Sequence, residues 1–375
     1  MAKLSVAIIT KNEEATIKEL LFKATRFADE VVVVDTGSTD KTIEYCKQLG
    51  IFPKEFKWCD DFAAARNYAF SQCSNNWVMW LDADDDLPKE TIEAILSLKN
   101  KELNQEKLIQ IFCPYHLSFD ENNNPKFKTI RERIVNIANG GQWIGAVHEY
   151  FDPFSQHMGE FSIEAMQIVI EHRPKKTEEE KDKYRNLKIL EKEFLKDPTN
   201  QRTILYLGNE YKEHGNYEKA LDFYEKYHKN PGCDWEQYYA FLQGASCIKM
   251  LDENLTLQYK TQLMLATKLC PERAEAWYQL GQHHYSLEEY KKAIPYFAAA
   301  KYCELPTSGF ITNEIYEHLA ADLLSVCLHR CGYHEEAIRY AKIAYHHSPD
   351  KKRIISNIEF YMQALAEQKK GYLNA

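Results

Sequence analysis

The first part of the chain alternates short apolar runs with stretches in which apolar residues recur at helical spacing. The apolar runs, each bounded by polar or turn-forming residues, predict strands at Leu4–Thr10, Val31–Asp35, Phe52–Phe56 and Val78–Leu81. The stretches between them predict helices at Glu14–Phe27, Thr39–Leu49 and Phe62–Cys73. This order is typical of an α/β domain with a mainly parallel sheet and helices on both faces.

Polar residues cluster directly after three of these predicted strands. The clusters are Thr10–Glu13, Asp35–Asp40 and Asp82–Asp86. In a mainly parallel sheet the ligand site lies at the carboxyl ends of the strands, so we expect the three clusters to meet there. Ser38 or Asp40 is also a suitable N-cap for the helix that follows.

The pattern changes twice in the rest of the chain. Further strands are predicted at Leu108–His116, Phe127–Asn136 and Phe161–Glu171, and the polar run Arg173–Glu180 separates them from an all-helical remainder. We therefore place a domain boundary near Pro174, with an α/β domain at residues 1–174 and a helical domain at residues 175–375.

The helical remainder contains a repeated pattern of small and large residues. The pattern occurs as Gly208, Tyr211, Gly215, Tyr217, Ala220 and Tyr224, then as Trp277, Leu280, Gly281, Tyr290, Ala293, Phe297 and Ala300, and then as Ala321, Leu324, Leu328, Gly332, Ala337, Ala341, Ala344 and Pro349. These offsets match the roughly 34-residue tetratricopeptide pattern, and with a degenerate unit near Gly244 they predict about four repeats. Asp182–Leu195 is expected to be a linker helix or a cap. The alternative is a helical bundle without true repeats.

The composition is that of a soluble, folded protein, with 45% hydrophobic and 27% charged residues. A formal net charge of -9 argues against nucleic acid as a partner. We find no pattern of a signal peptide and no apolar run long enough to span a membrane. The ten cysteines form no CxxC pair, and several lie at apolar positions of repeat helices, which favours reduced thiols and a cytoplasmic protein.

An apolar run at Trp77–Leu81 leads directly into the acidic residues Asp82, Asp84, Asp85 and Asp86. Carboxylates this close together repel one another unless a cation neutralises them. Asp82 and Asp84 therefore predict a divalent cation, Mg²⁺ or Mn²⁺, that would hold the phosphates of a nucleotide. For Asp85 and Asp86 the alternative is a solvated loop that caps a helix starting near Pro88.

Four segments together resemble the family-two glycosyltransferases of the GT-A fold: Ile8–Glu14, Val33–Thr42, Ala65–Asn67 and Leu81–Asp84. The resemblance implies a metal-dependent enzyme that uses a nucleotide-sugar donor, expected to be UDP-linked. It implies that the nucleoside is bound by Thr10, Asn12, Glu13 and Asp35. Asp82 would then face the ribose or the metal, and Asp84 would bind the metal.

Arg66 has a physical role independent of this resemblance. A guanidinium group can neutralise a phosphate or hold an aspartate in place, so Arg66 is a candidate donor-binding residue. The alternative is an ordinary charged residue on the surface of a helix.

The segment Gly140–Glu149 places glycines and Trp143 before a His-Glu pair. In the enzymes that this chain resembles, a Gly/Trp loop lines the junction of donor and acceptor, and an acidic residue after it is the catalytic base. Glu149 occupies that place, although Asp is commoner there; its alternative is an ion pair with Arg131 or Arg133.

A histidine is also expected to take part in the metal site. Many GT-A enzymes carry a metal-binding histidine at the end of a late strand, and His172 matches this position. His148 is the competing candidate.

The repeats bear on the acceptor, because helical repeats build a concave surface suited to extended chains. The combination of domains resembles bacterial enzymes that glycosylate peptides, notably the S-glycosyltransferases of glycosylated bacteriocins. We expect inverting transfer to a Cys or Ser/Thr side chain of a peptide or protein. The alternatives are a saccharide or lipid-linked acceptor, with the repeats forming a homodimer, or an interaction scaffold without activity.

Overall fold

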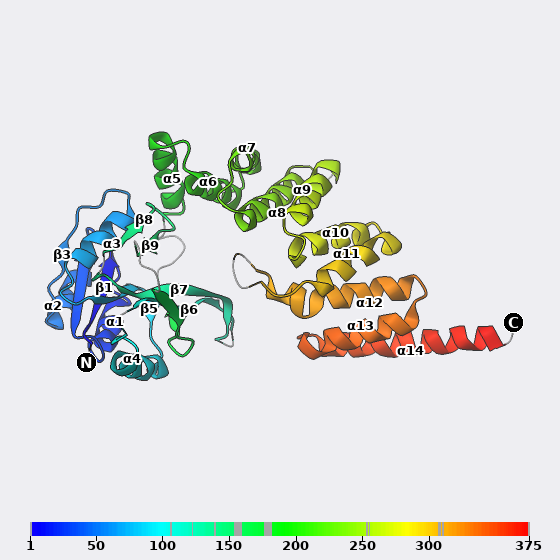
Figure 1. The fold of residues 1–375 in the computed structure, drawn as a ribbon, viewed down its shortest axis with the longest axis horizontal. Helices are drawn as coiled ribbons and strands as arrows, with labels where there is room; N and C mark the ends of the chain where they lie inside the picture. The colour runs from blue at the N-terminus through cyan, green and yellow to red at the C-terminus, as the bar shows by residue number, and fades with distance from the viewer. Residues whose placement is uncertain are drawn as a thin grey trace. The chain divides into compact units, whose positions relative to one another are not determined.

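The computed structural model describes residues 2–105, 107–121, 123–138, 140–153, 160–175, 182–252, 254, 256–306, 309 and 311–373. The chain divides into two compact units, Met1–Leu190 and Glu191–Ala375, which we call unit 1 and unit 2 (Figure 1). Helix α5 (Arg185–Lys196) begins in unit 1 and ends in unit 2. The sequence-based boundary near Pro174 lies before this helix, and residues 176–181 of the predicted polar run lie outside the described residues.

Unit 1 is built on a mixed sheet in which the strands follow the order β3-β2-β1-β4-β7-β6-β11-β5, with β10 also paired to β6. The strands are β1 (Leu4–Thr10), β2 (Glu30–Asp35), β3 (Lys54–Glu55), β4 (Trp77–Asp82), β5 (Asp85–Asp86), β6 (Leu108–Phe119), β7 (Pro125–Asn136), β10 (Phe161–Glu164) and β11 (Ile170–His172). Strands β1 to β4 pair in parallel, as do β10 and β11 with β6, whereas β7 runs antiparallel to β4 and β6. The mainly parallel α/β domain predicted from the sequence is confirmed.

Alternate residues of each strand point to opposite sides of the sheet, and both sets include apolar side chains. Helices therefore cover both faces. On one face, Val6 and Met79 share a hydrophobic core with α1 (Ile17–Ala24), α2 (Thr42–Gln48) and α4 (Lys89–Lys101). On the other face, Ala7 and Trp80 pack in a second core with α3 (Phe62–Ser71). Beside α3 lies a small hairpin of β8 (Gln142–Ile144) and β9 (Tyr150–Asp152).

Some predicted elements differ in extent from the observed ones. The predicted strand Phe52–Phe56 is reduced to the two residues of β3, which lies at the edge of the sheet beside β2 alone. The predicted strand Phe161–Glu171 is two strands, β10 and β11, because a turn closed by the Ile168 amide and the Ala165 carbonyl interrupts it. The N-cap of α2 is Lys41, and neither Ser38 nor Asp40 takes that position. The Asp40 carboxylate nevertheless accepts a hydrogen bond from the Thr42 amide.

The described part of unit 2 consists of tetratricopeptide-like helical hairpins, as predicted. The helices are α6 (Gln201–Glu213), α7 (Tyr217–Lys229), α8 (Asp234–Leu251), α9 (Thr256–Leu269), α10 (Ala274–Ser286), α11 (Tyr290–Tyr302), the π-helix η1 (Ile315–Leu319), α12 (Ala320–Arg330), α13 (His334–His347) and α14 (Lys351–Leu373). Glycines allow the closest helix approaches: a Cβ atom on Gly208 would come within 2.6 Å of the Tyr224 ring, and one on Gly281 within 2.7 Å of the Phe297 ring.

Among the described residues, no helix is both long and apolar enough to cross a membrane.

Candidate active site

A cleft of about 410 Å³ opens in unit 1 at the carboxyl ends of β1, β2 and β4. It is the place at which the sequence predicted that the polar clusters meet. The predicted site residues that line the cleft are Thr10, Glu13, Arg66, Asp82, Asp84, His148, Glu149 and His172. The cleft is also lined by Arg131, which the sequence suggested only as a partner of Glu149, and by residues that were not predicted as site residues: Ile9, Lys11, Thr36, Trp58, Phe62, Trp80, Ala83, Tyr115, Val147, Arg185 and Asn186.

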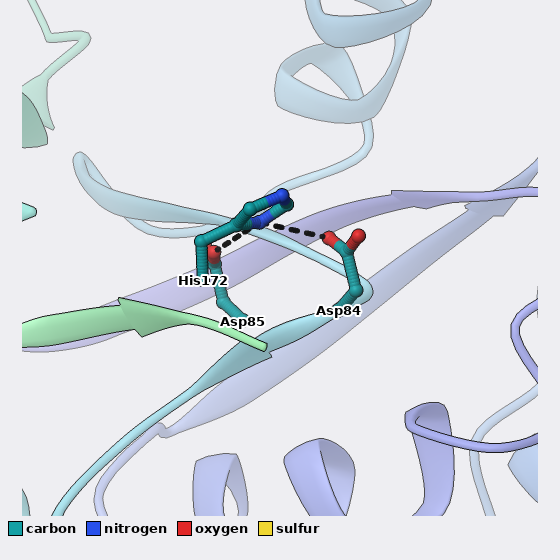
Figure 2. Close-up of side chains that lie close together, drawn as sticks. All are labelled: Asp84, Asp85 and His172. Carbon is teal, nitrogen blue, oxygen red and sulfur yellow. Dashed lines mark ion pairs between the residues drawn. The ribbon is translucent and has the colours of Figure 1, made fainter. Parts of the chain in front are cut away.

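Backbone pairing brings the acidic cluster and His172 together. Strand β4 ends at Asp82, the chain turns, and β5 then pairs antiparallel with β11, so that His172 lies opposite Asp85. The Nδ1 atom of His172 lies 3.5 Å from Oδ1 of Asp84 and 3.8 Å from Oδ1 of Asp85 (Figure 2). These three side chains offer ligand atoms that all lie within 4.8 Å of one another.

The electrostatics of this cluster fit a divalent cation. Burial is the main cause that raises the pKa of Asp84 to about 6; His172 lowers it, and the carboxylates of Asp82, Asp85 and Glu13 raise it further. Burial alone would lower the pKa of His172, but Asp85, Asp84 and Asp82 raise it. Neighbouring carboxylates thus contribute to both shifts. One nitrogen and several carboxylate oxygens are a donor set that Mg²⁺ or Mn²⁺ accepts.

Arg66 is not a surface residue but a buried one, with 5% of its surface exposed. Its Nη2 atom donates to Oδ1 of Asp82 at 2.8 Å, and its Nε atom donates to Oε1 of Glu149 at 2.7 Å. The guanidinium group also stacks 4.3 Å from the Trp80 ring centroid. Burial would raise the pKa of Asp82, but Arg66 and then Arg133 lower it to about 2, so Asp82 is ionised.

Glu149 is held by a well-fixed loop between β8 and β9. Asn67 exchanges two hydrogen bonds with the backbone of Trp143, at 2.8 and 2.9 Å, and the Phe62 amide donates to the carbonyl of Ala146. The Glu149 carboxylate pairs with Arg66 rather than with Arg131 or Arg133, the two arginines proposed as its alternative partners. Arg131 instead donates to the Glu149 carbonyl at 3.2 Å.

The residues predicted to bind a nucleoside fall into two groups. Thr10 and Glu13 line the cleft, whereas Asn12 and Asp35 lie behind it and shape the loop. The Asn12 side chain accepts from the Thr39 amide at 2.7 Å, and Oδ2 of Asp35 accepts from the amides of the next turn. Oδ1 of Asp35 and Oγ1 of Thr10 are buried and have no hydrogen-bond partner among the described residues, but of these two residues only Thr10 lines the cleft.

Trp143 and His148 do not occupy the places that the sequence suggested. The Trp143 ring is 2% exposed and packs edge-on against Trp80 and Phe70 in the core, so it supports the cleft from below and does not line it. His148 lines the cleft with a left-handed backbone, at φ 55°. Of the two histidines only His172 belongs to the described cluster of potential metal ligands.

Asp85 is not part of a solvated loop that caps a helix, the alternative that the sequence left open. Its side chain is fully buried, and α4 is preceded by Pro88 with no side-chain cap. The residues that surround Asp85, Tyr115 and Arg133, come from β6 and β7 and were not predicted as part of the site. The available signal was weak: Arg133 directly precedes the apolar pair Ile134 and Val135, and an arginine that is buried with them needs an acidic partner. Asp86 is not a cap either; it pairs with Lys23 of α1.

Comparison with known proteins places this site in a family context. Residues 5–137 match the family model described as glycosyl transferase family 2. The chain is 36% identical to an uncharacterized glycosyltransferase of Rickettsia bellii over 129 residues, which are 30% of this chain and 44% of that protein. It is 24% identical to the SPbeta prophage-derived glycosyltransferase SunS of Bacillus subtilis over 232 residues, which are 60% of this chain and 52% of SunS.

Among solved structures, glucosyl-3-phosphoglycerate synthase from Mycobacterium tuberculosis, crystallised with Mg²⁺ and UDP, is similar to 30% of this chain and 44% of that one. The identity is 22% and the TM-score is 0.27, a likeness too low to bear on function. The chain spans about half the length of the curated relatives described above.

Proposed function

We propose that this chain, whose N-terminal part is a family 2 glycosyltransferase domain, transfers a sugar with inversion from a UDP-linked donor to a side chain of a peptide or protein. The observation that supports this most directly is the convergence of two groups in one cleft. One group, Asp84 and His172, fits a divalent cation; the other is the buried ion pair of Arg66 and Glu149.

Asp84 and His172 would hold Mg²⁺ or Mn²⁺, and the ion would neutralise the diphosphate of the donor. Thr10 and Asp35 would bind the nucleoside through the two buried oxygens that have no partner among the described residues. Asp82, kept ionised by Arg66, would accept a hydrogen bond from the ribose or contribute to the metal site.

Glu149 would be the general base. As the acceptor hydroxyl or thiol attacks the anomeric carbon, its proton passes to the Glu149 carboxylate and the bond from that carbon to the diphosphate oxygen breaks. Arg66 fixes the orientation of this carboxylate through Nε, and only 12% of the Glu149 side chain is exposed. The acceptor attacks the anomeric carbon in line, on the face opposite the diphosphate, so the configuration at that carbon is inverted.

The proposed peptide acceptor rests on unit 2. The match to SunS covers 60% of the chain, which is more than the 190 residues of unit 1, so it extends into the helical hairpins. A hollow of about 750 Å³ in unit 2 is lined by residues of α8, α9, α10 and α12, among them Tyr259, Gln282 and Tyr285. Such a surface suits an extended polypeptide.

The first test is a panel of UDP- and GDP-sugars with Mn²⁺, measured by thermal shift and then by donor hydrolysis. A glycosyltransferase is stabilised by at least one donor and hydrolyses it slowly, whereas an inactive scaffold does neither. The competing saccharide or lipid-linked acceptor, with a homodimer formed through the repeats, is tested separately by comparing transfer to peptides and to oligosaccharides and by light scattering.

A further inference from the structure

The Asp85 carboxylate uses nearly all of its hydrogen-bonding capacity inside the protein. Its Oδ2 atom accepts from the amide of Asp82 and from Nη1 of Arg133, both at 2.9 Å. Its Oδ1 atom accepts from the hydroxyl of Tyr115, also at 2.9 Å. A carboxylate oxygen has about two acceptor positions, so Oδ2 is saturated and Oδ1 has one position left.

Arg133 makes this arrangement rigid and electrically neutral. Its side chain is fully buried, with the guanidinium carbon 3.7 Å from the Trp80 ring centroid and 4.0 Å from the Tyr115 ring centroid. The positive charge therefore lies directly against Oδ2 of Asp85, whereas His172 lies nearest to Oδ1. A cation bound by Asp85 itself would be repelled by Arg133, which makes Asp85 a poor direct ligand although it lies within reach.

Asp85 is nevertheless connected to both of the residues that can bind the metal. The bond from the Asp82 amide to the Asp85 side chain closes the turn that contains Asp84. The backbone of Asp85 pairs with that of His172 between β5 and β11, and the Arg173 amide donates to the Asp84 carbonyl at 2.9 Å. Any shift of Asp85 thus moves Asp84 relative to His172.

We infer that Asp85 is a positioning residue, held by Tyr115 and Arg133, that sets the separation of the metal-binding atoms of Asp84 and His172 without binding the metal itself. This inference rests on the metal site of the proposed function. Outer partners of this kind typically change metal affinity by 10- to 100-fold when they are removed.

Mn²⁺ alone is the probe, titrated into the full chain by calorimetry and followed by electron paramagnetic resonance. Tyr115→Phe removes one hydrogen bond to Asp85 and keeps its charge pair, so the fold should survive; we expect Mn²⁺ affinity to fall about 10-fold. The resonance should broaden because the two ligands are less well fixed. Asp84→Asn should abolish binding, and Asp86→Asn, the neighbouring control that pairs with Lys23, should leave affinity unchanged.

Asp85→Asn leaves Arg133 buried without its charge partner, so its melting curve must first show a folded protein. If folded Asp85→Asn loses Mn²⁺ as completely as Asp84→Asn, Asp85 is a ligand and the inference is wrong. Unchanged affinity and line width in Tyr115→Phe would also overturn it. Failure of the unaltered protein to bind Mn²⁺ would overturn both this inference and the metal site. If that protein still transferred a sugar, the proposed glycosyltransferase activity would stand without the metal.

Discussion

Asp84 is the residue whose loss should separate metal binding from folding. Its pKa is raised by burial and by the carboxylates around it, so the ionised side chain is repelled in the metal-free protein. We expect Asp84→Ala to melt at the same or a higher temperature than the unaltered protein and to lose Mn²⁺-dependent binding of the donor. Calorimetry with and without Mn²⁺ measures both effects, and undiminished Mn²⁺-dependent turnover in this variant would contradict the metal-site assignment.

Replacement of Glu149 should lower the rate of sugar transfer and leave donor binding unchanged. Glu149→Gln keeps a carbonyl oxygen that can accept from Nε of Arg66, so the loop and Arg66 should stay in place. The amide cannot take up the acceptor proton, and we expect transfer to fall by about 10² or more with donor affinity retained. If transfer and donor hydrolysis both persist, the base lies elsewhere. Asp85 is excluded as that base, since it is buried against Arg133.

The sequence predicted the cleft residues that belong to local patterns and missed contacts between residues that are distant in the chain. Thr10, Asp82 and Asp84 follow apolar strands directly, and strand-end polar residues are a local signal. The pairing of Asp85 with Arg133 joins residues 48 positions apart in neighbouring parts of the sheet, and no local pattern encodes it. Arg66 likewise donates to both Asp82 and Glu149, and Glu149 lies on a loop 83 positions later in the chain.

At the scale of elements, the close approach of paired helices in unit 2 depends on glycine at particular positions. A methyl group on Gly281 would meet the Phe297 ring at 2.7 Å, whereas the nearest atom to one on Gly244 of α8 would lie at 3.5 Å. We expect Gly281→Ala to lower stability by about 1–3 kcal/mol through overpacking. Gly244→Ala is the matched control and should be neutral or stabilising by up to about 1 kcal/mol, because alanine favours the helix. Thermal unfolding of the full chain compares the two; equal shifts would show that the ring contact is not the cause.

Helix α7 should make the stability of unit 2 depend on pH. His228 stacks on Phe241 at 3.9 Å, and both of its ring nitrogens are buried without a hydrogen-bond partner among the described residues. Burial lowers the pKa of His228 from 6.5 to about 4. As pH falls below 6.5, His228 takes up a proton in the unfolded chain before it does so in the folded protein. The free energy of unfolding is therefore not reduced by His228 above pH 6.5, and it falls as pH decreases from 6.5 to about 4.

The measurement for His228 is the free energy of unfolding between pH 7 and pH 5. His228→Phe should reduce the pH slope by at most about 1.4 kcal/mol per pH unit, the limit for one proton. The exposed His347 of α13 supplies the control, since His347→Gln should leave the slope nearly unchanged. A slope identical in all three proteins would show that His228 is not buried as described.

Elements were predictable from the sequence where their periodicity was long enough. Strands β1, β2 and β4 and the helices between them follow from runs of apolar residues, and their bounds agree to within a few residues. Strand β5 consists only of Asp85 and Asp86, so it has no apolar run to reveal it and exists because β11 pairs with it. That pairing brings His172 to the turn that contains Asp84, so the strand that the sequence could not predict positions the proposed metal site.

At the scale of the whole molecule, the position at which the chain is divided determines what a truncation measures. Arg185 and Asn186 of α5 line the cleft of unit 1, and Arg185 lies 4.8 Å from the Phe62 ring centroid. A chain ending at Leu190 keeps these residues, so we expect it to retain donor affinity while losing transfer to a peptide acceptor. A chain ending at Pro174 lacks them and should also bind the donor more weakly.

Both shortened chains must first show a cooperative melt, because removal of unit 2 can expose apolar surface. Calorimetry with the UDP-sugar then gives the donor affinity. A transfer assay over a range of concentrations of the best acceptor peptide gives the acceptor affinity. Acceptor affinity that is the same with and without residues 191–375 would show that the helical hairpins do not recognise the acceptor. An oligomerisation role and a saccharide acceptor would then be favoured.

The late position of β11 also has a consequence for biosynthesis. His172 follows Asp84 by 88 residues, and β5 has no partner strand until β11 has been made. At roughly 5–20 residues per second, the ribosome needs about 4–18 s to cover that interval, during which the acidic turn exists without its histidine. During that interval a metal ion cannot be held by Asp84 and His172 together. We expect protein made without the metal to be folded and to bind the ion when it is added later, without renewed synthesis.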